Sequence, residues 1–238
     1  MAAKTGQIAV LIDPEKAQSS SQLDELIEKA TFPQVDYSFV GGSTVPREQF
    51  EFTTAYLHQK TSIPLVIFPG SSHQIGQNAD ALLYISLLSG RNPDLLVGQH
   101  IESAFEVYQL PLEVIPTGYI LMDGGTQSSV AYVSQTTPIP RNQHAIALKT
   151  AIAGHLMGKK VLFFDAGSGA LHSVSPVLIE EVRQKLNIPI IVGGGIKSLA
   201  ELNGLAAAGA NVLVVGNKLE EDIDFLLDIQ QFKGNQHQ

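Results

Sequence analysis

The stretch from Ile190 to Asn217 constrains the fold more than any other part of the chain. It contains two short apolar runs, 190–192 and 212–215, and each of them leads into glycine. Between the runs, leucine and alanine recur at the spacings of three and four residues that are typical of a helix. This order predicts a strand, a glycine-rich turn, a helix and a second parallel strand, which together form a βαβ unit.

The two turns of this unit predict a phosphate site. Gly194-Gly195 and Gly216-Asn217 follow the two strands at their carboxyl ends. Glycine lets backbone N–H groups approach a ligand closely, and the positive end of a following helix favours an anion. Two such turns on neighbouring strands near the end of a chain are typical of the phosphate cradle in a (β/α)8 barrel. The alternative is that these glycines only form tight turns.

The rest of the chain repeats the alternation of strand and helix. Length agrees with one barrel, because 238 residues lie close to the roughly 250 that are typical of this fold. The predicted strands that precede this βαβ unit are 8–12, 37–40, 65–68, 81–86, 112–121 and 160–164. The predicted helices outside that unit are 20–30, 46–59, 93–108, 144–157, 176–186 and 222–232.

Two irregular regions interrupt this alternation. Residues 74–78 are too few and too polar for a full helix, so the third helix is predicted to be reduced or replaced by a loop and a short strand. Residues 124–141 have little periodicity and are predicted to cover the barrel mouth or to form an oligomer contact. Strand five is expected to be interrupted at residues 116–119. We predict a single (β/α)8 TIM barrel domain over residues 1–238; an open doubly wound sheet is the alternative, disfavoured because polar residues follow nearly every strand.

Composition excludes several classes of function. A formal net charge of −8 with no cluster of lysine and arginine argues against nucleic-acid binding. The absence of cysteine excludes disulfides and thiolate metal sites. No apolar run is long enough for a transmembrane segment or a signal peptide, so we expect a cytoplasmic protein.

Polar residues at the predicted strand ends suggest a metal site. Asp13 and Ser43 follow the first two strands, which are neighbours in a barrel. A carboxylate and a hydroxyl, completed by diphosphate oxygens and water, are suitable ligands for Mg²⁺. Arg91, after the fourth strand, offers a cation that could bind a diphosphate. Each has an ordinary alternative: Asp13 could cap its turn, Ser43 could be a turn residue, and Arg91 could form an ion pair at a helix start.

The stretch 163–170, with the sequence FFDAGSGA, is the most unusual motif in the chain. Asp165 ends a strand next to the phosphate turns, so it could act as general base toward a hydroxyl of a phosphorylated substrate. Gly167, Ser168 and Gly169 could form a third arm of the anion site, although the motif could also be an Asx-type turn. The histidines show no metal-ligand spacing.

Taken together, the motifs resemble the geranylgeranylglyceryl phosphate synthase family of prenyltransferases, in its archaeal and Bacteroidetes-type branch. The resemblance covers nearly the whole chain, and its motifs stand in the same order at the same strand ends. They are LIDPEK (11–16), VGGST (40–44), FPGSS (68–72), SLLSGRNP (86–93), PTGYIL (116–121), FFDAGSGA (163–170), VGGGIKS (192–198) and VVGN (214–217).

The resemblance implies transfer of a geranylgeranyl or similar long prenyl group from a prenyl diphosphate to the 3-hydroxyl of sn-glycerol 1-phosphate. It implies a barrel without a normal third helix, Mg²⁺ at Asp13 and Ser43, a homo-oligomer (dimer or hexamer), and transient membrane contact for the lipid product. It also implies Asp165 as the base. The implied glycerol phosphate site comprises Phe163, Phe164, Asp165, Ala166, Gly167, Ser168, Gly169, Gly194, Gly195, Gly216 and Asn217.

Two positions depart from the family pattern. The family motif begins Tyr-Leu-Glu, whereas this chain has Phe163-Phe164-Asp165. The change removes one hydroxyl and shortens the catalytic side chain by one methylene, so an altered acceptor or a non-catalytic phosphate-binding barrel is an alternative. An isomerase or aldolase-like barrel is disfavoured, because no lysine ends a strand to form a Schiff base. Tyr119 and Leu121 could line the groove for the prenyl chain or belong to the barrel core.

Overall fold

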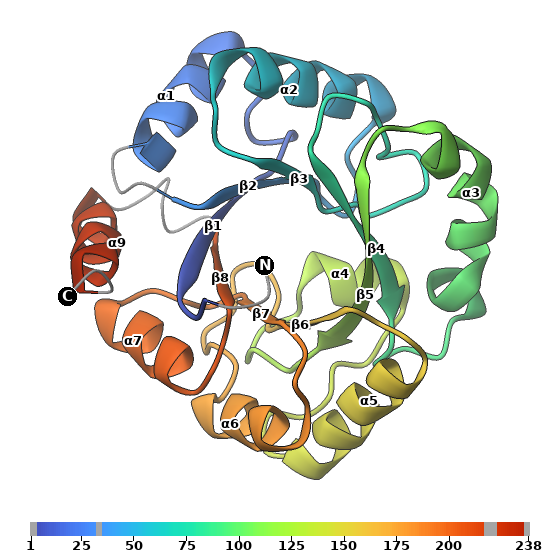
Figure 1. Cartoon of the computed structure of the whole chain (residues 1–238), viewed down its shortest axis with the longest axis vertical. Helices are drawn as coiled ribbons and strands as arrows, with labels where there is room; N and C mark the ends of the chain where they lie inside the picture. Colours follow the sequence, from blue (N-terminus) through green and yellow to red (C-terminus); the bar gives the residue numbers. More distant parts are fainter. Residues whose placement is uncertain (1–3, 32–34, 217–222, 236–238) are drawn as a thin grey trace.

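Eight parallel strands close into a barrel in the computed structural model, which describes residues 4–31, 35–216 and 223–235 (Figure 1). Each strand pairs with the next in the chain, and the last pairs with the first. The prediction of a (β/α)8 barrel is confirmed, and the closed sheet excludes the doubly wound alternative. The strands are β1 (Gln7–Ile12), β2 (Tyr37–Val40), β3 (Leu65–Ile67), β4 (Ala81–Leu87), β5 (Glu113–Leu121), β6 (Val161–Asp165), β7 (Ile190–Gly193) and β8 (Val212–Val215).

Helices surround the barrel, as Figure 1 shows. A π-helical segment, η1 (Asp94–Gly98), leads directly into α3, where the sequence pattern predicts one continuous helix. Asp222, the predicted first residue of the last helix, lies outside the described residues. The helices are α1 (Ser20–Thr31), α2 (Arg47–Lys60), α3 (Gln99–Gln109), α4 (Ser129–Ser134), α5 (His144–Leu156), α6 (Pro176–Lys185), α7 (Leu199–Ala207) and α9 (Ile223–Asn235).

The strands bury both of their faces. Successive side chains in a strand point to opposite sides, so one set fills the barrel and the other packs against the helices. Phe39, Tyr119 and Phe163 belong to the inner set, whereas Phe164 and Val192 belong to the outer one. The barrel interior is therefore a packed core and not a pore, and the space for a ligand lies at its ends and edges.

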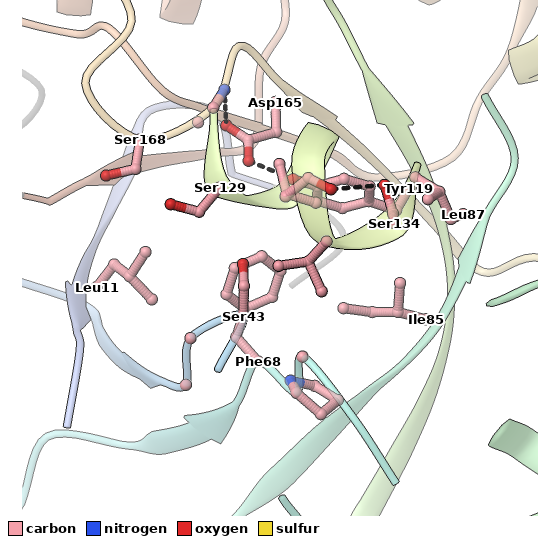
Figure 2. Close-up of a pocket in the computed structure, with 18 of the residues that line it drawn as sticks. Leu11, Ser43, Phe68, Ile85, Leu87, Tyr119, Ser129, Ser134, Asp165 and Ser168 are labelled. Carbon is pink, nitrogen blue, oxygen red and sulfur yellow. Dashed lines mark hydrogen bonds between the residues drawn. The ribbon is translucent and has the colours of Figure 1, made fainter. Parts of the chain in front are cut away.

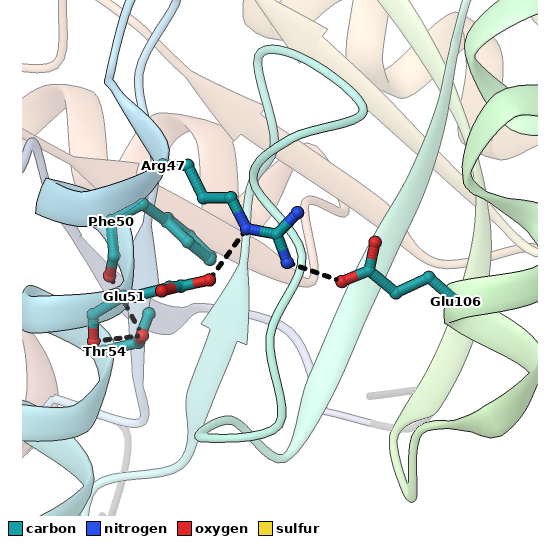
Figure 3. A network of polar contacts seen from close by, with 5 residues as sticks. All are labelled: Arg47, Phe50, Glu51, Thr54 and Glu106. Carbon is teal, nitrogen blue, oxygen red and sulfur yellow. Dashed lines mark hydrogen bonds and ion pairs between the residues drawn. The ribbon is translucent and has the colours of Figure 1, made fainter.

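No helix connects β3 to β4: residues 68–80, all of which the structure describes, contain only turns, bends and irregular chain. This confirms the prediction that the third helix is replaced. Across the gap, Arg47 of α2 contacts Glu106 of α3 at 3.0 Å and Glu51 of its own helix at 2.8 Å (Figure 3). These side chains are about half exposed, so the pairs contribute little to stability, but they show that α2 and α3 are neighbours here.

Strand β5 is continuous, so the predicted interruption at residues 116–119 is wrong. Proline lacks the N–H that a strand normally donates to its neighbour. In a parallel strand the N–H and C=O of one residue face the same neighbour, and the Pro116 carbonyl accepts a hydrogen bond from Lys160 on the side of β6. The pairing of β5 with β6 begins only at Thr117 and Val161. The missing N–H of Pro116 therefore lies before the first paired residue of β5, and the strand tolerates the proline.

Candidate functional site

One cavity of about 850 Å³ opens at the carboxyl ends of the strands. Its polar part is formed by the turns after β1, β2, β6, β7 and β8, and its apolar part extends along β4 to Leu95 of η1. Figure 2 shows how Ser43, Tyr119, Asp165 and Ser168 approach this space from different sides. The arrangement follows from barrel closure, which brings strand ends from the whole chain to one mouth.

Most of the residues predicted for the site line this cavity. Phe164 does not, because it belongs to the layer between barrel and helices and is fully buried there. Ala166 is buried and is also outside the lining set. Asn217 lies outside the described residues. The predicted residues that line the cavity are Asp13, Ser43, Tyr119, Phe163, Asp165, Gly167, Ser168, Gly169, Gly194, Gly195 and Gly216.

Arg91 is placed in a turn and not at the cavity. Its guanidinium donates to the carbonyls of Gly90 at 2.7 Å and Leu88 at 3.3 Å, and the residue is exposed. It is not among the residues that line the cavity. The prediction of a cation at the mouth therefore does not agree with the structure, because this side chain folds back onto its own loop.

Asp13 and Ser43 are brought together at the mouth by the pairing of β1 with β2. The Asp13 carboxylate accepts the Glu15 N–H at 3.0 Å and lies against the turn before Ser43, where a Cβ on Gly42 would come within 3.0 Å of its Oδ1. Thr44 donates to the Glu15 carboxylate at 2.7 Å and joins the two turns. Burial raises the pKa of Asp13.

This donor set fits Mg²⁺. Carboxylate and hydroxyl oxygens are hard ligands, and Mg²⁺ commonly takes only one or two protein ligands while phosphate and water complete its shell. In the part of the chain that the structure describes, no group of three or more histidine and carboxylate side chains could enclose an ion by itself. Asp13 and Ser43 would therefore supply only part of the coordination shell of such an ion.

Gln74 supports this corner of the site, and the sequence analysis did not identify it. Its amide is fully buried, donates to the Gly42 carbonyl at 2.8 Å and accepts the Gly70 N–H at 3.0 Å. A Cβ on Gly70 would lie 2.2 Å from the Gly42 oxygen, so the two turns touch backbone to backbone. The signal available in the sequence was a polar residue within the stretch that replaces the third helix. An amide there can form hydrogen bonds with backbone groups of neighbouring turns.

Asp165 ends β6 and lies between two hydrogen-bond donors. Its Oδ1 accepts the Gly167 N–H at 2.8 Å, and its Oδ2 accepts the Tyr119 hydroxyl (Figure 2). Burial raises the pKa of Asp165, and the two hydrogen bonds act in the opposite direction because they stabilise the charged form. Burial and the neighbouring Asp165 raise the pKa of Tyr119 well above its ordinary value. Tyr119 is thus a partner of the carboxylate and not only part of an apolar groove.

The turn after β7 forms a close-packed cradle around this carboxylate. Gly194 and Gly195 have φ values of +77° and +70°, which residues other than glycine rarely adopt. A Cβ on Gly194 would lie 2.6 Å from Asp165 Oδ1 and one on Gly195 would lie 2.7 Å from the His172 backbone. Helix α7 begins immediately afterwards, and Ser198 caps it by accepting the Glu201 N–H. Backbone N–H groups and a helix N-terminus at one place suit a phosphate.

The apolar arm of the cavity uses the space left by the missing third helix. Leu82 and Tyr84, on the outer face of β4, line it together with Ile75 and Leu95. Near the mouth, α4 contributes Val130 and Val133 to the lining. It also contributes Ser129 and Ser134, which Figure 2 labels beside the pocket. Helix α4, within the stretch 124–141 that was predicted to cover the mouth or to form an oligomer contact, therefore lines the cavity.

Comparisons with known proteins agree with this geometry. The PcrB family matches residues 3–233 of the chain. A geranylgeranylglyceryl phosphate synthase of Chitinophaga pinensis is 45% identical over 221 residues, which cover 93% of this chain and 87% of that protein. The enzyme of the same name from the archaeon Korarchaeum cryptofilum is 34% identical, with 95% of this chain and 92% of that protein covered.

Solved structures show the same relation. The Thermoplasma acidophilum (S)-3-O-geranylgeranylglyceryl phosphate synthase, in complex with its substrate sn-glycerol-1-phosphate, superposes with a TM-score of 0.86 at 31% identity, covering 95% of this chain and 91% of that one. A tryptophan synthase α-subunit from Pyrococcus furiosus has a TM-score of 0.61 at 12% identity and shares the fold alone.

Replacing Gln74 by leucine tests its support of the turns that contain Gly42 and Gly70. The Gln74→Leu variant should lower the free energy of unfolding by about 2–4 kcal/mol, because it leaves buried backbone groups of Gly42 and Gly70 without partners. Urea denaturation measures the change, and Gln59→Leu on the exposed surface of α2 is the matched control. Equal stabilities for the two variants would contradict the role assigned to Gln74.

Proposed function

Because this chain belongs to the PcrB family, we propose that it transfers a geranylgeranyl or similar long prenyl group from a prenyl diphosphate to the 3-hydroxyl of sn-glycerol 1-phosphate. The observation that carries the proposal is a single cavity that holds four features together. A glycine cradle and the partly buried Asp165 carboxylate lie on one side of it, and an Asp–Ser pair suited to Mg²⁺ lies on the other, beside an apolar arm. The product is an ether-linked lipid precursor.

The acceptor binds at the turns after β6, β7 and β8. The backbones of Gly194 and Gly195 and the nearby N-terminus of α7 hold its phosphate, together with Gly216 after β8. Support comes from the Thermoplasma structure, whose bound molecule is sn-glycerol-1-phosphate. This placement leaves the glycerol hydroxyls of the acceptor facing Asp165.

The donor binds at the opposite side of the same mouth. Asp13 and Ser43 would hold Mg²⁺, and when bound the ion would offset the charge that develops on the departing diphosphate. The prenyl chain lies in the apolar arm beside β4, where Leu82 and Tyr84 present carbon surface. The length of the prenyl chain that the protein accepts depends on where this apolar arm ends.

The chemistry that the residues support is removal of a proton from the acceptor hydroxyl. As the hydroxyl oxygen bonds to the allylic carbon, the bond from that carbon to the diphosphate breaks and the diphosphate leaves with the electron pair. Asp165 accepts the proton, and its pKa, raised by burial, makes it a stronger base than a carboxylate in water. Helix α4 narrows the opening above and limits the access of competing water.

A second candidate is an altered acceptor or phosphate binding without turnover. Phe163 and Asp165 favour it, because the family motif has tyrosine and glutamate at these positions. Against it, the Asp165 carboxylate is held in place and faces the same cavity as the cradle. The assay must therefore measure product formation and binding separately.

The test is a transfer assay with purified protein, labelled sn-glycerol 1-phosphate and geranylgeranyl diphosphate. We expect a labelled product that extracts into organic solvent, and we expect it to disappear with EDTA and to return with added Mg²⁺. The enantiomer sn-glycerol 3-phosphate is the matched control acceptor. Binding of glycerol phosphate without product would sink the transferase proposal and support the second candidate.

The Asp165→Asn variant tests the base. It should lower kcat about 10²-fold or more, because the amide cannot accept the proton, while glycerol phosphate still binds. Asp123→Asn is the control, because Asp123 likewise accepts the N–H of the residue two positions later but lies on the exposed side of the mouth. Turnover of Asp165→Asn near the wild-type rate would mean that another group is the base.

The Gly194→Ala variant tests the cradle. A methyl group there would crowd Asp165 Oδ1 and the Gly167 backbone, so affinity for glycerol phosphate should fall at least tenfold by calorimetry. Gly158→Ala separates crowding from backbone strain, because Gly158 has a similar φ of +85° but open space around its Cα. Equal affinities in the two variants would contradict the placement of the phosphate.

Three further expectations stay predictions. None of the described helices has the length and apolar character needed to cross a bilayer. We infer a cytoplasmic enzyme that meets the membrane only to exchange its lipid substrate and product. We also infer a homo-oligomer, supported by the exposure of Tyr132 (75%) and Val133 (50%) on α4; sedimentation velocity that shows only monomer would contradict it.

A further inference from the structure

The side chain that contacts Asp165 most closely comes from a different strand. Tyr119 on β5 donates its hydroxyl to Asp165 Oδ2, while the Gly167 N–H binds Oδ1. Residue 163 pairs with Tyr119 in the sheet register but is phenylalanine, so it has no hydroxyl to offer. Among the described residues, Tyr119 is thus the side chain shown to donate a hydrogen bond to this carboxylate.

The Tyr119 ring is held firmly enough to aim its hydroxyl. It packs edge-on against Phe163 with ring centroids 5.3 Å apart, and against Phe68 at 6.0 Å. Phe68 and Phe163 also contact each other at 5.2 Å, so the three rings form one cluster inside the barrel. Tyr119 is 4% exposed, and this packing restricts the ring whose hydroxyl donates to Asp165.

We propose that Tyr119 is a positioning residue of this site, whose hydroxyl holds the Asp165 carboxylate in one orientation and in its charged form. Aspartate is one methylene shorter than the glutamate of the family motif, so a small rotation moves its oxygens away from the acceptor. Pinning Oδ2 to β5 and Oδ1 to the turn after β6 removes that freedom. The inference rests on the proposed function for its kinetic consequence but not for the hydrogen bond itself.

Other titratable groups face the same cavity and must be considered. Among the described residues, burial has the largest effect on the pKa of Asp165 and raises it, and the hydrogen bonds from Tyr119 and Gly167 follow and lower it. The remaining titratable residues around the cavity are Asp13, Glu15 and Lys16 after β1, Tyr84 on β4, Asp94 on η1, His100 on α3 and Lys197 after β7.

The sign of the effect follows from which form the hydroxyl stabilises. The Tyr119 O–H binds the ionised carboxylate, so its removal favours the protonated form and raises the pKa of Asp165 further. A base works only when ionised. Turnover should therefore be lost at a higher pH in the absence of the hydroxyl and should recover as the pH rises.

The Tyr119→Phe variant tests this with a pH profile of kcat. We expect the acid-side midpoint of this profile to move to higher pH by about one unit. At pH values below the midpoint, kcat of the variant should be about tenfold lower than that of the wild type, and well above the midpoint the two values should converge. The KM for glycerol phosphate should change little. Tyr56→Phe is the matched control, because the Tyr56 hydroxyl also donates to an aspartate, Asp24, at 2.8 Å, but on the surface between α1 and α2.

A second measurement needs no substrate. Titration of the ¹³C-labelled aspartate carboxyl groups by NMR, with the Asp165 signal assigned from Asp165→Asn, should show a higher midpoint in Tyr119→Phe than in the wild type. If the wild type makes no lipid product, the proposed function fails while this titration still decides the role of Tyr119. An unchanged midpoint, or a kcat lowered by one factor at every pH, would overturn the inference.

Discussion

The closure of β8 onto β1 is the constraint on which the rest of the structure depends. A parallel barrel collects the carboxyl ends of all its strands at one mouth, whatever their separation in the chain. Asp13 and Asp165 are 152 positions apart, as their numbers show, yet both line one cavity because β1 and β6 belong to the same closed sheet. Packing of phenylalanine and branched side chains inside the barrel and beneath the helices holds this geometry, and the polar strand ends supply the chemistry.

The missing helix between β3 and β4 turns a regular barrel into one with room for a long apolar ligand. A helix at this position would cover the outer face of β4, where Leu82 and Tyr84 instead line the cavity. Gln74 takes over one structural task of the absent helix, because its buried amide ties the turns after β2 and β3 together. The same departure from the repeat therefore opens the apolar arm and supports the turn that carries Ser43 beside it.

The parts that the sequence predicted well were those with a local signal. Glycine pairs after apolar runs predicted the glycine turns at the mouth. Asp13 and Asp165 were identified as candidate site residues because they stand at the ends of predicted strands. The misses had two kinds of cause. Arg91 donates to carbonyls one and three positions before it, a local contact that no sequence pattern indicated. Pro116 is tolerated in a continuous strand for a non-local reason, because β6 begins only opposite Thr117. Gln74 and the Tyr119–Asp165 bond join segments 32 and 46 residues apart, and no local pattern encodes such a contact.

The sequence by itself determined the alternation of strands and helices, the absence of a normal third helix and the residue types at the strand ends. Those features depend on periodicity and on the backbone preferences of glycine and proline, which act within a few residues. Only the tertiary structure decided that Tyr119 donates to Asp165 and that Phe164 faces the helices. Side-chain orientation and burial arise when distant strands pack together, so they become definite only once the barrel has closed.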